Sequence, residues 1–328
     1  MHRVSKLLTI SVFSLLIFIL VLEFSYRYQL FDFYKAELKN LNPSIQQKKN
    51  KTILICGDSF TADPTSYVSV LRDSLPQFDI INIGVPGTGI RQHALYLPGR
   101  IKKYKPDVFI YQFYVGNDLF DIRHPYQSDS ISQLRKMYWY LSDKIISLAF
   151  LNFRFAGLRY PYLDDAGGNY SAKTLDSFSI ESYSRREKFN YRTEPGLIEN
   201  TLYLKNGRDR DWNLFKSTFS ELINMMEDSV KKYFVFIPHE SMLAPSLMKK
   251  HISLGARFSL RDIENNPLLL ELQSFCKDND IHFIDFSHPE VDTSLIQKLY
   301  YPNDPHLNRV GQLVLGKKIF NEIIKNEF

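Results

Sequence analysis

From about residue 52 to the C-terminus, short apolar runs alternate with segments of helical pattern. Most of these runs are rich in β-branched or aromatic residues and are followed by Gly or Pro, as β-strands are. Strands are predicted at Thr52–Cys56, Asp79–Ile83, Asp107–Tyr114, Tyr233–Ile237 and Ile281–Phe286. Helices are predicted at Tyr67–Leu75, Arg91–Tyr104, Trp212–Lys232, Pro267–Asp278 and Asn308–Lys325.

Strands that alternate with helices predict a parallel sheet covered by helices on both faces, which is an α/β fold. The chain has 328 residues, of which 44% are hydrophobic, so it can build a large core. In such folds, ligands bind beyond the carboxyl ends of the strands. Functional residues are therefore expected just after each predicted strand.

The alternation stops between about residues 119 and 212. This stretch is rich in Tyr, Ser, Asp and Arg, with one apolar helical piece near Tyr138–Phe150. We interpret it as an insertion or lid over the sheet edge, within a single domain that spans residues 52–328.

The N-terminus carries a targeting signal. Arg3 and Lys6 precede an uncharged apolar run, Leu7–Leu22, which is nearly long enough to span a bilayer. Bulky residues follow this run where a cleavage site would need small ones. We therefore predict an uncleaved signal anchor within residues 1–26. Its basic flank should stay in the cytoplasm, which leaves the rest of the chain periplasmic or exterior. Residues 27–51 are predicted to be a polar stalk.

Several classes of protein and site are disfavoured. The formal net charge is +5, but Lys and Arg form no stripe of the kind that nucleic-acid binding requires, so no nucleic-acid partner is expected. No two histidines have the spacing of a known zinc motif, so neither a metal nor another cofactor is expected. Cys56 and Cys276 lie in apolar stretches and are predicted to be buried free thiols.

Polar or flexible residues follow the first three strands. Ser59, in the sequence Gly57-Asp58-Ser59, follows the first strand, where a hydroxyl can meet substrate near a helix N-terminus. Gly87 lies in a glycine-rich turn after the second strand, and a backbone N–H there can stabilise a negative oxygen. Asn117 follows the third strand and can aim its amide into the same crevice. Each of these residues is also common in ordinary turns or caps.

A histidine block precedes the last predicted helix. His306, in the sequence Asn303-Asp304-Pro305-His306, can serve as a general base, and a nearby acid can orient its ring. The order along the chain is therefore nucleophile, two oxyanion donors, then base.

Together these blocks resemble the SGNH hydrolases, also called GDSL esterases and lipases. The resemblance covers roughly Ile53–Phe328, with the central insertion unmatched, and the N-terminal segment is similar to that of a membrane-anchored bacterial subgroup. It implies a three-layer α/β/α sandwich with a parallel, flavodoxin-like sheet. It also implies that Ser59 is the nucleophile, Gly87 and Asn117 are oxyanion donors, and His306 is the base.

The chain departs from the family pattern at the triad acid. Many members place this acid three residues before the histidine, where this chain has Asn303. Asp304 stands two residues before His306, which is the spacing of related envelope acetylation proteins. We therefore assign Asp304 as the acid, although some members are believed to use a Ser–His dyad.

The resemblance implies a serine esterase that removes an O-acyl group, in particular O-acetyl, from a cell-envelope glycan or a similar ester. Tyr300 and Tyr301, next to the histidine block, are candidates for substrate contact. Two alternatives stay open. One is an O-acyltransferase with the same Ser–His site, because only water exclusion separates transfer from hydrolysis. The other is an inactive, membrane-tethered glycan-binding protein.

Overall fold

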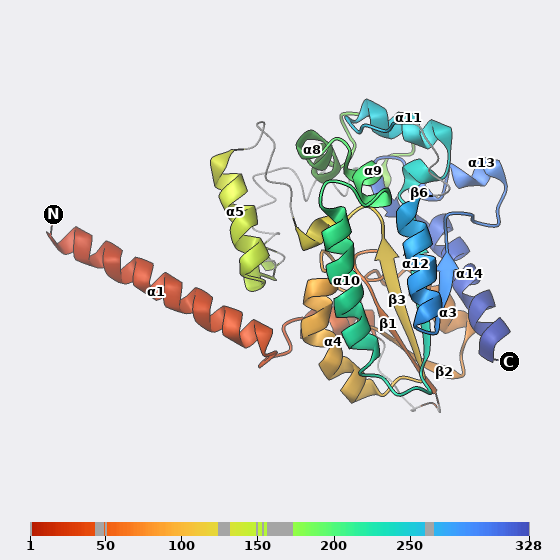
Figure 1. Cartoon of the computed structure of the whole chain (residues 1–328), viewed down its shortest axis with the longest axis horizontal. Coiled ribbons are helices and arrows are strands. Elements are labelled where there is room, and N and C mark those ends of the chain that lie inside the picture. Colours follow the sequence, from red (N-terminus) through yellow and green to blue (C-terminus); the bar gives the residue numbers. More distant parts are fainter. Residues whose placement is uncertain are drawn as a thin grey trace.

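Five parallel strands form the sheet on which the rest of the chain is built (Figure 1). The computed structural model describes residues 2–42, 49, 51–123, 132–148, 150–152, 154–155, 173–259 and 266–327. The strands are β1 (Lys51–Cys56), β2 (Phe78–Asn82), β3 (Val108–Tyr114), β4 (Lys231–Ile237) and β5 (Ile281–Asp285). Their order, β2-β1-β3-β4-β5, is that of flavodoxin-like sheets. The predicted fold class is thus confirmed, and each predicted strand lies within two residues of an observed one.

Helices cover both faces of this sheet. One face carries α4 (Ile90–Tyr104), α10 (Arg208–Ile223) and α12 (Pro267–Asp278), and the other carries α3 (Tyr67–Ser74) and α14 (Arg309–Glu327). Strand β1 shows why both faces are apolar. Leu54 and Cys56 belong to the first core, and Ile53 and Ile55 belong to the second. A strand buried on both faces reads as a continuous apolar run rather than an alternating one.

Two helical predictions need correction, and the prediction for the cysteines is confirmed. Cys56 and Cys276 are buried and free. Helix α10 ends at Ile223, well before the predicted Lys232, because residues from Lys231 onward pair with β3 as part of β4. The helix expected near Tyr138–Phe150 is α5 (Gln133–Lys144).

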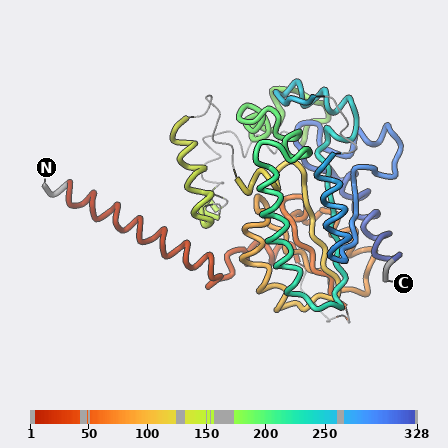
Figure 2. Tube along the Cα trace, viewed as in Figure 1, coloured from red at the N-terminus to blue at the C-terminus, as the bar shows by residue number. Residues whose placement is uncertain are grey.

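The end of the N-terminal helix and the segment that follows it pack on the folded body. Helix α1 (His2–Arg27) projects away from the sheet, and the chain then turns back against the body through α2 (Lys35–Leu41) (Figure 2). Tyr26 and Tyr34 are buried with their hydroxyl oxygens 2.6 Å apart, and Leu38 and Leu41 are buried beside them. The predicted stalk is therefore wrong for residues 27–42. The buried side chains recur at helical spacing, but the charged residues between them make this segment look polar in the sequence.

Part of the central segment lies at the carboxyl end of the sheet, together with the region after β4, whereas α5 lies to one side, at the left of the view (Figure 1). The described helices of the central segment are η1 (Phe120–Ile122), α5, α8 (Arg185–Thr193) and α9 (Leu197–Leu202). The region after β4 adds η2 (Glu240–Met242) and α11 (Pro245–Ser253). Residues 124–131 and 156–172 of the predicted insertion lie outside the described residues.

A small hairpin precedes the last helix. After α13 (Thr293–Ile296), strand β6 (Tyr300–Tyr301) pairs antiparallel with β7 (Asp304–Leu307). The Tyr300 hydroxyl donates to the Pro238 carbonyl at 2.6 Å, which fixes the hairpin beside the end of β4. No strand was predicted here, because both strands are very short and β7 contains a proline. The hairpin carries the histidine block to the carboxyl end of the sheet.

Candidate active site

Ser59, His306 and Asp304 form a continuous hydrogen-bonded chain. Ser59 Oγ lies 2.8 Å from His306 Nε2, and His306 Nδ1 lies 2.5 Å from Asp304 Oδ1. Because Nδ1 faces a carboxylate, it carries the ring proton, and Nε2 is left to accept the Ser59 hydroxyl hydrogen. Residues from opposite ends of the sequence thus meet with the hydrogen-bond pattern of a Ser-His-Asp triad.

The carboxylate of Asp304 is suited to hold the ring. Its Oδ1 atom also accepts the backbone N–H of His306 at 3.0 Å, and only 2% of the residue is exposed. Burial alone would raise the pKa of Asp304, but the charge of His306 and the hydrogen bonds from it outweigh burial and lower that pKa. Asp304 therefore stays ionised beside the ring.

Asn303, which occupies the usual triad position of the resembled family, has another role. Its Oδ1 accepts the Ser179 N–H at 2.8 Å, and its Nδ2 donates to the Ser177 carbonyl at 2.7 Å. Its own carbonyl accepts the Ser184 N–H at 2.9 Å. Asn303 thus fastens the central segment to the hairpin that bears His306, a role that has no sequence signal.

Ser59 lies in a tight turn after β1. Helix α3 begins only at Tyr67, so the expected position of Ser59 at a helix N-terminus is wrong. Instead, the Asp58 carbonyl accepts the N–H groups of Thr61 and Ala62 at 3.2 and 2.9 Å. The Asp58 N–H in turn donates to Gln112 Oε1 at 3.0 Å.

Gln112 was missed in the sequence, although it is the polar exception in the otherwise aromatic and aliphatic strand β3, VFIYQFY. It is buried and supports the serine turn through two hydrogen bonds. Its Oε1 accepts the Thr61 hydroxyl at 3.1 Å in addition to the Asp58 N–H. Gly57 is needed for this approach: a Cβ there would lie 2.4 Å from the same Oε1 atom.

Two backbone N–H groups are available at the mouth of the site. The Val85 N–H donates to the Gly57 carbonyl at 3.1 Å, which brings the glycine-rich loop alongside the serine turn. Gly87 is exposed and has a φ of +67°, a conformation that favours glycine. Within the described part of the chain, neither the Ser59 nor the Gly87 N–H has a hydrogen-bond acceptor. Free backbone donors of this kind are what an oxyanion hole requires.

The Asn117 amide is beside the nucleophile turn, but its N–H groups are engaged. Its Nδ2 donates to Asp58 Oδ2 at 3.2 Å and to Asp121 Oδ2 at 3.1 Å. Burial raises the pKa of the Asp58 carboxyl, which is also fixed by the Phe60 N–H. The structure thus brings Asn117 to the predicted place, with both amide hydrogens directed at carboxylates.

Aromatic residues form the wall behind His306. The Phe60 ring packs against the His306 ring with a centroid distance of 4.9 Å, and against the Tyr114 ring at 4.3 Å. The two residues predicted to contact substrate have different surroundings. Tyr300 is buried and bonded to Pro238, so it is not placed to touch substrate, whereas Tyr301 is half-buried, with the Lys173 ammonium 5.4 Å from its ring.

Comparison with known proteins finds similarity only among solved structures. No family model matches this chain, and no curated protein matches it. A lipolytic protein of the G-D-S-L family from Desulfitobacterium hafniense DCB-2 is 11% identical, with 83% of this chain and 99% of that chain covered and a TM-score of 0.40. A catalytic mutant of the acetylxylan esterase Axe2 from Geobacillus stearothermophilus is 12% identical, with coverage of 85% and 96% and a TM-score of 0.41. A lipase/acylhydrolase from Enterococcus faecalis is 13% identical, with coverage of 84% and 96% and a TM-score of 0.38. These similarities are too distant to support an argument about activity.

Proposed function

We propose that this protein is a serine ester hydrolase of the SGNH type, with Ser59, His306 and Asp304 as its triad. The observation that carries the proposal is the hydrogen-bonded chain from Ser59 Oγ through His306 to Asp304. The free backbone N–H groups of Ser59 and of Gly87, in the loop that Val85 joins to the serine turn, add support.

The proposed reaction has two halves. Ser59 Oγ attacks the ester carbonyl carbon while His306 Nε2 takes the hydroxyl proton. The tetrahedral intermediate collapses, His306 gives the proton to the departing alcohol oxygen, and an acyl-serine remains. Water then attacks this ester as His306 takes a water proton. Collapse releases the carboxylic acid and returns the proton to Ser59.

The proposed oxyanion hole consists of the N–H groups of Ser59 and Gly87. Asn117 is the proposed third donor, and it would have to exchange one of its two carboxylate partners for the oxyanion. Hydrogen bonds at catalytic sites often rearrange when substrate binds. Loss of one such donor typically lowers the rate by about 10²–10³-fold.

We propose an O-acyl ester, in particular O-acetyl, on a cell-envelope glycan as the substrate. The membrane-type helix α1 supports a location at the envelope. The half-buried ring of Tyr301, on the hairpin that carries His306, offers an aromatic surface of the kind that packs on sugar rings.

The test uses the full-length chain in detergent, with p-nitrophenyl acetate as substrate and a fluorophosphonate as a serine-specific label. Wild type should release nitrophenol and label at Ser59, whereas Ser59→Ala should do neither. Ser217→Ala, at an exposed serine, is the matched control and should behave as wild type. If wild type is inert and unlabelled, the proposal is wrong. Acyl transfer is recognised if a sugar acceptor, rather than water, takes the acyl group.

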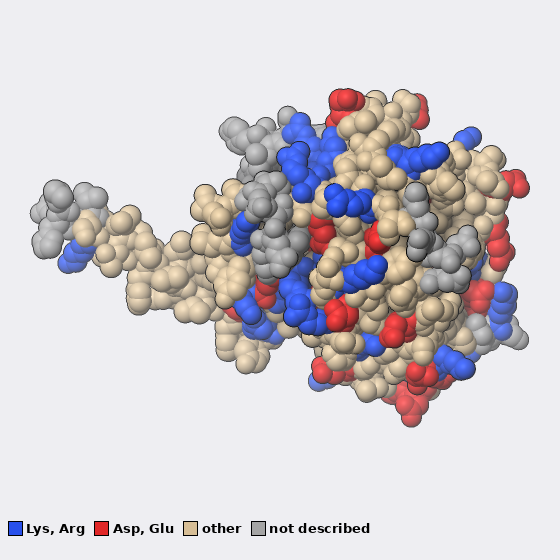
Figure 3. Space-filling model, turned by 45° about the horizontal axis from the view of Figure 1, so that its top comes forward, with Lys and Arg blue, Asp and Glu red and all other residues tan. Residues whose placement is uncertain are grey.

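We also propose that α1 is a retained membrane anchor with the catalytic domain outside the cytoplasm. The segment Ser5–Arg27 has a mean hydropathy of 2.6 and none of its most apolar window is buried. On the face that Figure 3 shows, α1 has a basic side chain close to its free end and only uncharged side chains from there to the body. Cleavage near the end of α1 would also remove Glu23, whose carboxylate accepts the N–H groups of Ile146 and Ser147 at 3.1 and 2.8 Å.

Two measurements on cells test this anchor. Mass spectrometry of the membrane-bound protein should find the N-terminal peptide intact. Protease added to spheroplasts should digest the catalytic domain. A mature protein that begins after Leu22, or a domain that resists protease until the cells are lysed, would contradict the proposal.

A further inference from the structure

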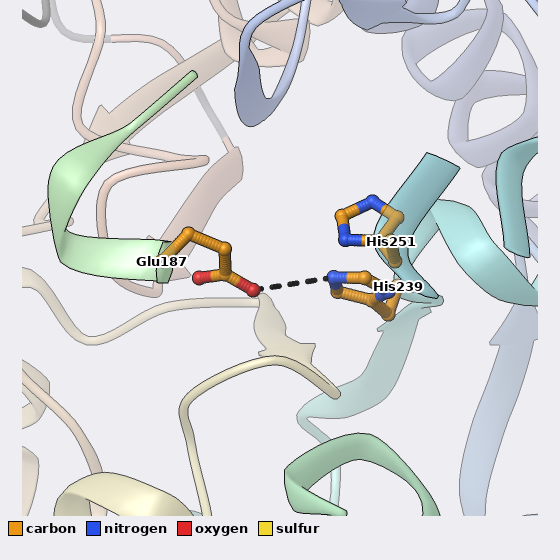
Figure 4. Close-up of side chains that lie close together, drawn as sticks. All are labelled: Glu187, His239 and His251. Atoms are coloured by element: carbon orange, nitrogen blue, oxygen red, sulfur yellow. Dashed lines mark ion pairs between the residues drawn. The ribbon is translucent and has the colours of Figure 1, made fainter. Parts of the chain in front are cut away.

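Three metal-ligand side chains converge in the interior at a place that the triad does not use (Figure 4). Glu187 comes from α8, His239 from the segment after β4, and His251 from α11. One carboxylate oxygen and one nitrogen of each ring all lie within 4.8 Å of one another. All three residues are buried, and both histidines are 0% exposed. Two imidazoles and a carboxylate are ligands that zinc prefers.

The His251 nitrogen that faces away from the cluster, Nε2, has a carboxylate partner. His251 Nε2 lies 2.7 Å from Glu240 Oε1, so it carries the proton and Nδ1 presents a lone pair to the cluster. Glu240 is itself fixed by Lys250 Nζ at 2.8 Å and by the Tyr183 hydroxyl at 2.9 Å. A carboxylate behind the distal nitrogen is the usual support of a metal-binding histidine.

His239 is held by a serine rather than by a carboxylate. Its Nδ1 accepts the Ser241 N–H at 3.3 Å and lies 2.7 Å from Ser241 Oγ, so Nε2 carries the ring proton and faces Glu187 Oε1 at 3.5 Å. This oxygen is buried and has no hydrogen-bond partner among the described residues. A buried carboxylate oxygen whose one charged neighbour is 3.5 Å away is poorly satisfied, and a cation beside it would stabilise it.

The fourth candidate ligand is a hydroxyl oxygen. The Tyr191 hydroxyl lies 2.7 Å from His251 Nδ1 and 3.2 Å from His239 Nε2. It thus lies within hydrogen-bonding distance of both inward-facing nitrogens.

We propose that Glu187, Tyr191, His239 and His251 form a structural zinc site. Ligand atoms around tetrahedral zinc lie about 3.4 Å apart, so the widest pairs among Glu187, His239 and His251 would approach by roughly 1 Å. The Tyr191 oxygen, now 2.7 Å from His251 Nδ1, would move slightly away from it. Two imidazole ligands favour zinc over Mg²⁺ or Ca²⁺. Binding releases the Tyr191 hydroxyl proton to solvent as its oxygen coordinates the ion, and any proton on His239 Nε2 shifts to Nδ1. With four protein ligands no position remains for water, which is typical of a structural site.

The position of this site gives it a consequence for catalysis. It joins α8 of the central segment to the end of β4 and to α11. The His239 ring lies 6.2 Å from the Tyr114 ring, which packs against Phe60, and Phe60 packs against His306. Zinc would therefore fix the wall behind the catalytic histidine without touching substrate. Sequence spacing could not reveal this site, because its ligands come from three separate elements.

The test titrates zinc chloride into the full-length protein in detergent after chelator treatment. We expect one zinc per chain by plasma mass spectrometry, and a Tm that rises with the logarithm of free zinc. Cobalt(II) in place of zinc should give the visible absorption of a tetrahedral site. A wild type that retains no zinc, with a Tm indifferent to the ion, would overturn the proposal and leave a purely hydrogen-bonded cluster.

Variants locate the site. Glu240→Gln removes the carboxylate behind His251 and should weaken zinc binding about 10–100-fold. Glu187→Gln removes a ligand and should weaken it further. His288→Ala, at an exposed histidine, is the control and should bind zinc as wild type does. If Glu187→Gln bound zinc as tightly as wild type does, the assignment of Glu187 as a ligand would be contradicted. The wild-type titration and the cobalt spectrum remain decisive if a variant fails to fold.

Discussion

Adjacent residues in the histidine block have separate roles. Asp304 faces the His306 ring, whereas Asn303 faces away and binds the backbone of the central segment. Asn303 lies in the turn between β6 and β7, and Asp304 is the first residue of β7, so the two side chains have different partners. A shift of the acid by one position along the chain is therefore compatible with a triad, provided that the hairpin presents Asp304 to the ring.

The first prediction concerns Asp304→Asn. An amide at this position can hold the wrong histidine tautomer, so kcat should fall by about 10³–10⁴-fold with little change in Tm. Ester hydrolysis kinetics and thermal unfolding of the full-length protein measure the two effects. The double variant Asp304→Asn/Asn303→Asp should not recover activity, because residue 303 does not reach the ring. Recovery in that variant would assign the acid to position 303.

The second prediction concerns Asp118, whose carboxylate accepts the Tyr114 N–H at 2.6 Å. Burial, together with the nearby charge of Asp58, raises the pKa of Asp118 well above its usual value of 3.8. The folded protein therefore holds this proton at pH values where the unfolded chain has lost it. Stability should fall as pH rises from about the unfolded value through the raised one.

Asp118→Asn removes that titration while its amide oxygen can still accept the Tyr114 N–H. The free energy of unfolding of wild type should therefore decrease, relative to that of Asp118→Asn, as pH rises. Urea unfolding at pH 5, 6, 7 and 8 measures it. Asp73→Asn, at an exposed position, is the control. Parallel pH profiles for wild type and Asp118→Asn would contradict the prediction.

The sequence could indicate the reacting residues but not the residues that hold them. Ser59 stands in a short block at a predicted strand end and His306 in one before the last predicted helix, and the structure brings these blocks together. The contacts of Gln112 and Asn303 are made across long sequence separations, so no local pattern encodes them. The engaged amide of Asn117 likewise depends on where Asp58 and Asp121 lie after folding.

At the scale of elements, the long strands and helices were predictable and the short ones were not. Strand β4 and helix α12 carry continuous apolar or amphipathic patterns, which local sequence determines. Strands β6 and β7 have two and four residues and form only because the hairpin docks on the end of β4. The elements that complete the site are thus the ones that depend most on tertiary contacts.

The third prediction tests the tether between the hairpin and the central segment. Asn303→Ala loses two side-chain hydrogen bonds with backbone groups of that segment. We expect a loss of about 1–3 kcal/mol in stability, since buried polar partners are left unpaired. We also expect a lower kcat, because the hairpin carries His306. Asn224→Ala, at an exposed asparagine, should change neither quantity. Unchanged thermal unfolding and kinetics in Asn303→Ala would show that the hairpin is held by other contacts.

At the scale of the whole molecule, the N-terminal segment joins the apolar helix to the catalytic body. Glu23 and Arg27 near the end of α1 contact the chain around residues 144–147, and Tyr26 stacks on Phe150 with ring centroids 5.7 Å apart. The chain then runs through α2 into the core. Movement of α1 is therefore coupled to the body rather than isolated by a free linker.

The fourth prediction follows from this coupling. A chain that begins at Lys51 lacks Tyr26, Tyr34, Leu38 and Leu41, all of them buried. Burial of one large apolar side chain contributes about 1.5–3 kcal/mol, so their combined loss is comparable to the whole stability of about 5–15 kcal/mol of a typical domain. A chain that begins at Glu23 should fold with a cooperative thermal transition, whereas one that begins at Lys51 should aggregate or unfold at a much lower temperature. Calorimetry of both chains measures this. Equal transition temperatures would mean that residues 23–42 only rest on the body, and that the catalytic domain is energetically independent of its anchor.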